Sequence, residues 1–119
     1  MRLLFKYVAL IIIALFSLTS AATPTPATAL EVNHLLKFIA TTDCQYERNS
    51  DKHTGKEAAE HIKKKYDYFK DKIVSAEDFI ELGATKSAVT GSKYRVHCPG
   101  VAVQDSDQWL LAELKKVRK

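Results

Sequence analysis

The fold is decided by residues 44–69, which read CQYERNSDKHTGKEAAEHIKKKYDYF. Cys44 and Tyr46 alternate with polar residues, the pattern expected of a strand that buries one face. Residues 49–53 contain no apolar side chain, and their Asn, Ser and Asp side chains favour local backbone hydrogen bonds, so this run is expected to be a turn. Thr54 and Glu57 have the spacing of a capping box, which predicts that a helix begins there.

The predicted helix has an apolar stripe along its whole length. The members of this stripe recur at steps of three and four residues: Ala59, Ile62, Tyr66, Phe69 and Ile73. At about 100° per residue, the row that contains His61 and Lys65 borders this stripe. These two polar side chains are therefore expected at the edge of the core, whereas Lys63 and Lys64 should point toward water.

The rest of the chain predicts three more helices and one more strand. An amphipathic helix is expected over residues 29–41, with Thr28 as a possible cap and Leu30 on its apolar face. A short helix should follow the Ser75 cap and end at Gly83 in a left-handed conformation, and a last helix should begin near residue 106. Residues 94–98 alternate like a strand. The expected fold is a small single α+β domain with about four helices packed on a short two-stranded antiparallel sheet.

The amino-terminal residues have the composition of an export signal. Arg2 and Lys6 precede an apolar run, and small residues follow it, so residues 1–22 are expected to be a secretory signal peptide cleaved near Ala22 or Thr23. A retained membrane anchor is the alternative, but the apolar run is shorter than the roughly 20 residues that a spanning helix needs. Residues 23–28, TPTPAT, should form an extended linker, and residues 29–119 the domain. We expect a periplasmic or secreted protein with no stable membrane insertion after cleavage.

The charge balance gives no reason to expect a nucleic-acid partner. The whole sequence has 18 basic and 14 acidic residues, a formal charge of +4. Removing Arg2 and Lys6 leaves 16 basic residues against 14, a charge of +2. The basic run at residues 63–65 is typical of a solvated helix face.

The two cysteines lie one on each predicted strand. In an oxidising compartment this arrangement favours a disulfide between Cys44 and Cys98. Closing a loop of about 55 residues contributes on the order of 4 kcal/mol of stability in the loop-entropy model. If the strands pair antiparallel with the cysteines opposed, Arg48 falls opposite Tyr94 and the guanidinium should lie beside the ring.

Metal binding and hydrolysis are two alternatives to a role in binding a partner or ligand. Asp51, His53 and His61 are candidate metal ligands, but they form no paired ligand motif, so neither a metal nor another cofactor is predicted. A small hydrolase could use Ser87 or Ser92 with His61, but no nucleophile-elbow motif supports one. No catalytic residue is therefore assigned.

Several separated blocks between residues 45 and 96 have a familiar order and spacing. They include Arg48-Asn49, Glu57-Ala58-Ala59 with His61 and Lys65, Ala76-Glu77-Asp78-Phe79-Ile80, Ser87, and Thr90-Gly91-Ser92-Lys93-Tyr94. Together they resemble the small exported bacterial proteins of the YfeK type, a family with no established activity. The resemblance implies a polar set whose members are Arg48, Asn49, His61, Lys65, Ser87 and Tyr94. Family members often have glycine at the position of Ser50, which leaves the turn conformation there open.

The leading hypothesis is a non-enzymatic exported domain that binds a protein partner or a small anionic ligand. Arg48, His61, Lys65 and Tyr94 would form the binding surface, because a guanidinium, an amine and an imidazole suit a carboxylate or a phosphate. A surface-acting inhibitor or structural envelope protein, and a small hydrolase, are the alternatives. The same polar residues could instead form an internal network that links turn, helix and strand.

Overall fold

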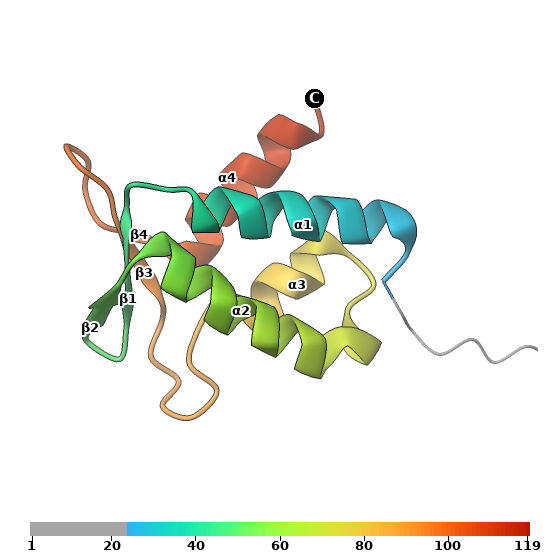
Figure 1. Cartoon of the computed structure of the whole chain (residues 1–119), viewed down its shortest axis with the longest axis horizontal. Coiled ribbons are helices and arrows are strands. Elements are labelled where there is room, and N and C mark those ends of the chain that lie inside the picture. The colour runs from blue at the N-terminus through green and yellow to red at the C-terminus, as the bar shows by residue number, and fades with distance from the viewer. Residues whose placement is uncertain (1–23) are drawn as a thin grey trace, which may run out of the picture.

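The computed structural model describes residues 24–119, so the predicted signal peptide, residues 1–22, lies outside the described residues (Figure 1). The helices are α1 (Pro26–Ala40), α2 (Gly55–Phe69), α3 (Ala76–Gly83) and α4 (Ser106–Val117), with a 3-10 turn η4 (Lys70–Lys72) after α2. The strands are β1 (Gln45–Arg48), β2 (Asp51–His53), β3 (Arg95–His97) and β4 (Gln104–Asp105). The α+β class with four helices is confirmed, but the sheet has four strands rather than two.

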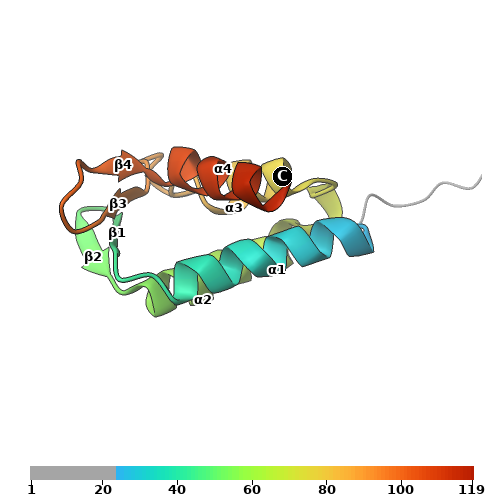
Figure 2. The same cartoon turned by 90° about the horizontal axis from the view of Figure 1, so that it is seen from above.

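The helices form two layers, and the sheet closes one end of both. Figure 2 shows α1 beside α2 in one layer and α3 beside α4 in the other, with the strands at the far end from the start of α1. The core lies between the layers and includes Leu35, Ile62, Phe79 and Leu110, all essentially inaccessible to solvent. No helix within residues 24–119 has both the length and the apolar character that crossing a bilayer requires.

Helix α1 begins earlier than the sequence pattern predicts. Thr25 is the N-cap and Pro26 the first helical residue, so part of the expected linker is helical. Proline fits here because the first turn needs no amide donor and its φ is already helical. Thr28, expected as the cap, is instead buried and donates its hydroxyl hydrogen to the Val74 carbonyl at 3.0 Å. Leu30 was placed wrongly on the apolar face, since it is 72% exposed.

Helix α2 is confirmed with both bonds of its capping box. The Thr54 hydroxyl accepts from the Glu57 amide, and the Glu57 carboxylate accepts from the Thr54 amide. Gly55 lies against the end of α1, where a Cβ would overlap the Ile39 carbonyl oxygen. A residue without a side chain at position 55 thus allows α1 and α2 to approach closely.

The sheet is antiparallel in the order β2-β1-β3-β4. Between β1 and β3, Tyr46 pairs with Val96, as the predicted register requires. The predicted turn is shorter than residues 49–53: only Asn49 and Ser50 reverse the chain, with positive φ angles of 52° and 70°, and residues 51–53 form β2. The two-residue turn works because both central residues take the left-handed conformation that matches the strand twist.

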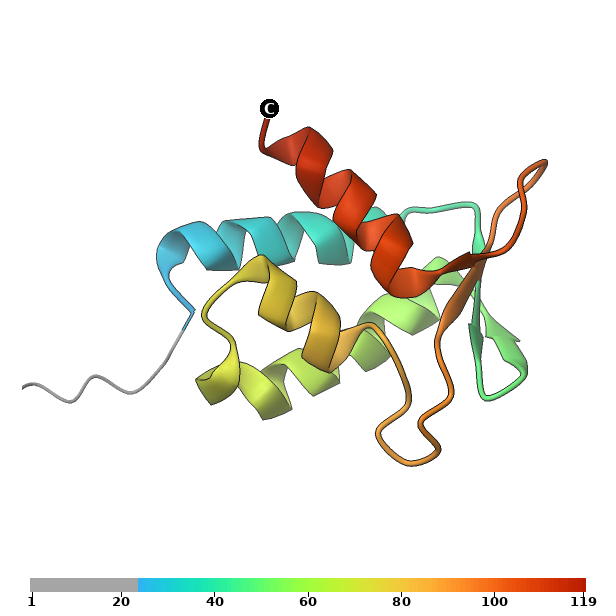
Figure 3. The same cartoon turned by 180° about the vertical axis from the view of Figure 1, so that it is seen from behind.

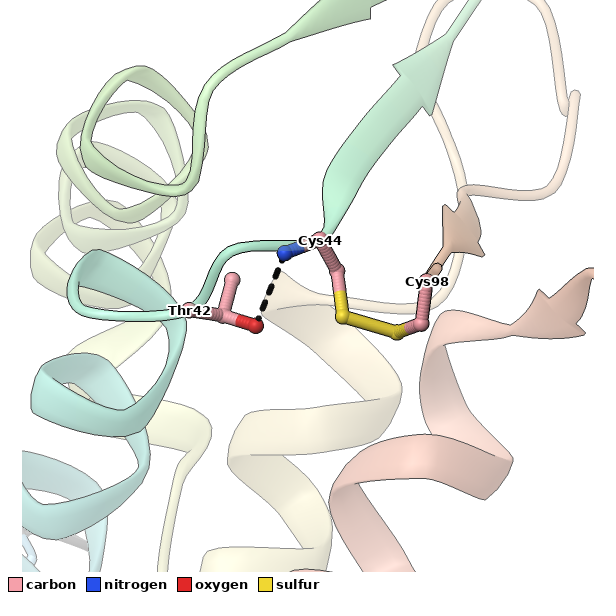
Figure 4. Close-up of a disulfide and its surroundings, with 3 residues drawn as sticks. All are labelled: Thr42, Cys44 and Cys98. Atoms are coloured by element: carbon pink, nitrogen blue, oxygen red, sulfur yellow. Dashed lines mark hydrogen bonds between the residues drawn. A yellow bond between two sulfur atoms is a disulfide. The ribbon is translucent and has the colours of Figure 1, made fainter. Parts of the chain in front are cut away.

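The predicted disulfide is confirmed between Cys44 and Cys98 (Figure 4). The two residues lie at the ends of β1 and β3, where their Cα atoms are 4.3 Å apart. Such a distance is typical of residues directly opposed on antiparallel strands. The Cys44 amide also donates to the Thr42 hydroxyl at 3.2 Å, which fixes the chain as it leaves α1.

Helices α3 and α4 complete the core (Figure 3). Ser75 caps α3 as predicted, but Gly83 is its last helical residue and has no positive φ, so the left-handed stop was wrong. At the start of α4, the buried hydroxyls of Tyr46 and Ser106 are 2.7 Å apart. At its end, Arg118 makes ion pairs with Glu31 of α1 and Glu77 of α3.

Candidate functional site

The site is centred on the phenol of Tyr94, in the segment that leads into β3. The side chain is 2% exposed, and its hydroxyl oxygen lies 3.3 Å from His61 Nε2. Lys65 Nζ donates to the same oxygen at 3.2 Å and to the Lys86 carbonyl at 2.8 Å. The ammonium also lies 4.9 Å from the centroid of the Tyr94 ring, a cation–π distance. Helix α2 and the 84–93 loop are thus joined through one lysine and one tyrosine.

These contacts favour a neutral His61. Because Lys65 can only donate, the Tyr94 oxygen accepts from it and the phenol hydrogen is free to point at His61 Nε2. That bond needs an imidazole whose Nε2 carries no proton. Burial lowers the pKa of His61 below its ordinary value, and the positive charges of Arg48 and Lys65 lower it further. Burial is a larger cause of this lowering of the His61 pKa than the neighbouring charges.

Lys65 and Tyr94 also titrate away from their ordinary values. Burial lowers the pKa of Lys65, and the charge of Arg48 adds to that effect. Burial raises the pKa of Tyr94, whereas Arg48 opposes the rise by favouring a phenolate. All three groups are therefore electrostatically coupled to Arg48.

Arg48 is the last residue of β1 and is half-buried. Within residues 24–119, no carboxylate or carbonyl oxygen forms a hydrogen bond or ion pair with its guanidinium. The expected stacking of Arg48 on Tyr94 was wrong in one respect, since the cation over that ring belongs to Lys65. The last pair between β1 and β3 is Glu47 with Arg95, and Arg48 and Tyr94, the next residue on each side, both line the same cleft.

Asn49 and Ser87 hold the 84–93 loop in place. The buried Ser87 hydroxyl accepts from the Val89 and Thr90 amides at 3.3 Å each. The Thr90 hydroxyl donates to Asn49 Oδ1 at 2.6 Å, which ties the loop to the hairpin turn. These bonds use Ser87 as a turn acceptor and do not join it to His61, the pairing that a hydrolase would need.

All six residues of the predicted polar set line one open cleft of about 550 Å³, here called the Arg48 cleft. The rest of its wall consists of Lys64, Tyr68, Phe69, Ala88 and Val89. Among the described residues, no aspartate or glutamate lines this cleft. The arrangement is an electropositive hollow bordered by apolar side chains.

The apolar residues that line the cleft were not predicted from the sequence. Phe69 was assigned only to the core stripe, and no function was predicted for Tyr68 or Val89. Tyr68 is 79% exposed and Val89 is 93% exposed, and all three residues line the cleft. For Tyr68 a signal was present: it lies three residues after Lys65 and four after Lys64, spacings that place side chains together on a helix surface. For Val89 no local pattern exists, because the loop carries it to the cleft.

The arrangement suits recognition of an anion. The Arg48 fork offers parallel N–H groups, and Lys65 retains one ammonium hydrogen beyond those given to Lys86 and Tyr94. Lys64, which is exposed, adds a further positive charge to the lining. A carboxylate or phosphate would compensate the repulsion between the charges of Arg48 and Lys65.

Comparisons with known proteins agree with the resemblance. A family model described as "Family of unknown function (DUF5329)" matches residues 26–118. The chain is 30% identical over 90 residues to the "Uncharacterized protein YfeK" of Salmonella typhimurium (strain LT2), and the match covers 75% of each chain. No solved structure matches the chain significantly.

Proposed function

The chain belongs to the DUF5329 family, whose function is not established, and from this premise we propose that it is an exported, non-enzymatic protein that binds an anionic group in the Arg48 cleft. The anionic group belongs to a small ligand or to a partner. The lining of the cleft supports binding over catalysis, because its polar groups suit recognition and, among residues 24–119, bring no nucleophile next to a base.

The observation that carries the proposal is the environment of Arg48. The half-buried guanidinium has no hydrogen-bond acceptor among residues 24–119, and the neighbouring Lys65 ammonium carries a charge of the same sign. An anion in the cleft would supply acceptors and remove this repulsion at once. An anionic ligand would therefore be attracted by both positive charges.

Export is supported by the sequence and by the disulfide. Residues 1–22 have a basic start, an apolar run and small residues near Ala22, and structural disulfides are typical of oxidising compartments. Cell fractionation and intact mass measurement test this part. A protein that begins near Ala22 or Thr23 in the soluble envelope fraction is expected, whereas a membrane-bound protein that retains Met1 would contradict it.

Binding is tested by titrating the purified protein with acetate, phosphate and phenylacetate at constant ionic strength. Isothermal calorimetry gives the affinity, and NMR follows the Arg48 Nε–H group and the His61 ring. At least one anion is expected to bind saturably, and Arg48→Ala should weaken it at least about tenfold, because a charge-assisted bond contributes about 1.5–3 kcal/mol.

Arg95→Ala is the matched control. This substitution removes the same charge from the same sheet. Arg95 lies on the opposite face of the sheet from Arg48, because side chains alternate between the two faces along β1 and β3. Its substitution is expected to leave the affinity within about twofold. The proposal fails if none of the anions binds, or if both arginine variants weaken binding equally.

A further inference from the structure

Because the apolar wall adjoins the unpaired guanidinium, we infer that the ligand of the Arg48 cleft is a small amphiphilic carboxylate: a carboxylate head on Arg48 and Lys65, and an aromatic or short aliphatic body against Tyr68 and Val89. This inference rests on the proposed function, since it assigns the chemical class of the anion that the cleft binds.

The apolar wall consists of side chains that the core does not use. Tyr68 and Val89 lie far out in solvent, with exposures of 79% and 93%. Tyr68 packs edge-on against Phe69, with ring centroids 4.8 Å apart and an interplanar angle of 90°. Single exposed apolar residues are ordinary, but these come from a helix and from a distant loop and meet at the same charged cleft.

The cleft offers the apolar body a partly organised surface. The Tyr68–Phe69 pair fixes one corner, and the hydrogen bonds of Ser87 fix the turn that carries Ala88 and Val89. A ring or short chain that enters here would be covered on two sides. A ligand without such a body would leave these groups in water and forgo that part of the binding energy.

The donor geometry favours a carboxylate head over a phosphate. Two parallel N–H groups of a guanidinium match the two oxygens of a carboxylate in one plane. Lys65 already gives hydrogens to the Lys86 carbonyl and the Tyr94 hydroxyl, so it retains one for the ligand. Two guanidinium donors and one ammonium donor suit the two oxygens of a carboxylate, whereas a phosphate has further oxygens that would need donors from elsewhere in the cleft.

The size of the cleft limits the ligand to a small molecule. Its volume of about 550 Å³ lies within the range of small-molecule sites, about 300–1,000 Å³. A benzene ring joined to a carboxylate fits that space, and a folded domain does not. The volume therefore fits a free acid of this size.

The test compares four probes in calorimetric titrations of the purified protein: acetate, phenylacetate, phenylacetamide and phenyl phosphate. Phenylacetate is expected to bind about tenfold more tightly than acetate, the factor that follows from burying about 60 Å² of apolar surface. Phenylacetamide, which has the body without the charge, and phenyl phosphate should each bind more weakly than phenylacetate.

Two variants separate the apolar wall from the anion site. Replacing Tyr68 and Val89 together by serine should remove the advantage of phenylacetate over acetate and leave acetate binding unchanged. Both side chains are exposed, so folding should be unaffected. Leu30→Ser removes another exposed apolar side chain, outside the lining of the cleft, and should change neither affinity.

The outcomes distinguish this inference from the proposed function. If acetate and phenylacetate bind equally and both depend on Arg48, the anion site stands and the amphiphilic ligand is wrong. If phenyl phosphate binds most tightly, the carboxylate head is wrong. If phenylacetamide binds as well as phenylacetate, the cleft does not select a charged head. If none of the four binds and inorganic phosphate does not bind either, the proposed function fails as well.

Discussion

The imidazole of His61 is held neutral by its surroundings, so its protonation should cost stability. Its pKa is lowered in the folded state, chiefly by burial, and is near 6.5 when the chain is unfolded. A lowered folded pKa means that the unfolded chain binds the proton more readily. The resulting contribution to stability is complete above about pH 6.5 and is lost as the pH falls toward the folded pKa.

His61→Gln is expected to reduce the loss of stability between pH 7 and pH 5. Urea unfolding at several pH values measures that loss, and an NMR titration gives the pKa of His61 directly. Arg48→Ala should raise the pKa of His61 because it removes a nearby positive charge, whereas Arg95→Ala, on the other face of the sheet, should leave it unchanged. An identical pH dependence in wild type and His61→Gln would contradict this account.

Ser50 is the residue whose backbone conformation is least suited to its side chain. Its φ of 70° lies in the left-handed region, which costs most residues about 1–2 kcal/mol and glycine almost nothing. Ser50→Gly is therefore expected to stabilise the fold by about 0.5–1 kcal/mol, measured by chemical denaturation.

Ser92→Gly is the control for that substitution. Ser92 is also exposed and lies in a loop, but its φ is not positive, so glycine there should give no gain. If both substitutions change the stability alike, backbone strain at Ser50 is not the cause.

At the scale of helices, the contact between α1 and α2 depends on Gly55. Gly55→Ala would press a methyl group into the Ile39 carbonyl oxygen and the Thr42 side chain, so the two helices must move apart. We expect a loss of about 1–3 kcal/mol, the usual cost of overpacking. Thermal and urea unfolding of the variant measure it.

Gly83→Ala provides the comparison within α3. A Cβ at this position would meet the nearest atoms of Phe79 at 3.7 Å, an ordinary contact, so the added methyl group fits. Because alanine favours a helix over glycine, the stability should stay the same or rise by up to about 1 kcal/mol. Equal losses at Gly55 and Gly83 would show that close approach of α1 and α2 is not what matters.

The elements that the sequence predicted are those with a buried apolar pattern. The register of β1 and β3 followed from placing Cys44 opposite Cys98, and α2 followed from its stripe and capping box. Strand β2 was not predicted because none of its side chains is apolar or buried. Strand β4 was not predicted because it has only two residues, too few to show the alternation of a strand. The start of α1 was missed because its first turn contains a proline, which the pattern alone assigns to a linker.

Part of the polar half of the candidate site was predictable from the same patterns, whereas Asn49 and Ser87 were expected only from the resemblance to the YfeK type. His61 and Lys65 lie at a fixed angle from the stripe of α2, and the strand register placed Arg48 opposite Tyr94. The contribution of Val89 could not be predicted, since it depends on how the 84–93 loop folds back on the hairpin through Thr90 and Asn49. Contacts made by a loop have no sequence period.

For the molecule as a whole, the disulfide joins segments that are far apart in the chain. Cys44 and Cys98 are separated by 54 positions, and their bond fixes the two central strands relative to each other. Breaking it should lower the free energy of unfolding by on the order of 4 kcal/mol, mainly because the unfolded chain gains freedom.

Urea unfolding with and without reductant measures the loss, together with a variant in which both cysteines are alanine. The variant should match the reduced protein, because each lacks the same cross-link. A loss below about 1 kcal/mol in both would show that the bond adds little to the helices and core. Two free thiols in unfolded protein that was never reduced would contradict the bond itself.

The order of the sheet also limits how the protein can associate with itself. Its outer strands, β2 and β4, have three and two residues, and the side chains of Asp51, Lys52 and Asp105 are charged. A second copy that added a strand at either edge would gain few backbone hydrogen bonds and would bring like charges together. The central strands β1 and β3 are covered on both sides by strands of the same chain. The short, charged edge strands β2 and β4 therefore disfavour the strand-by-strand addition of further copies that builds a fibre.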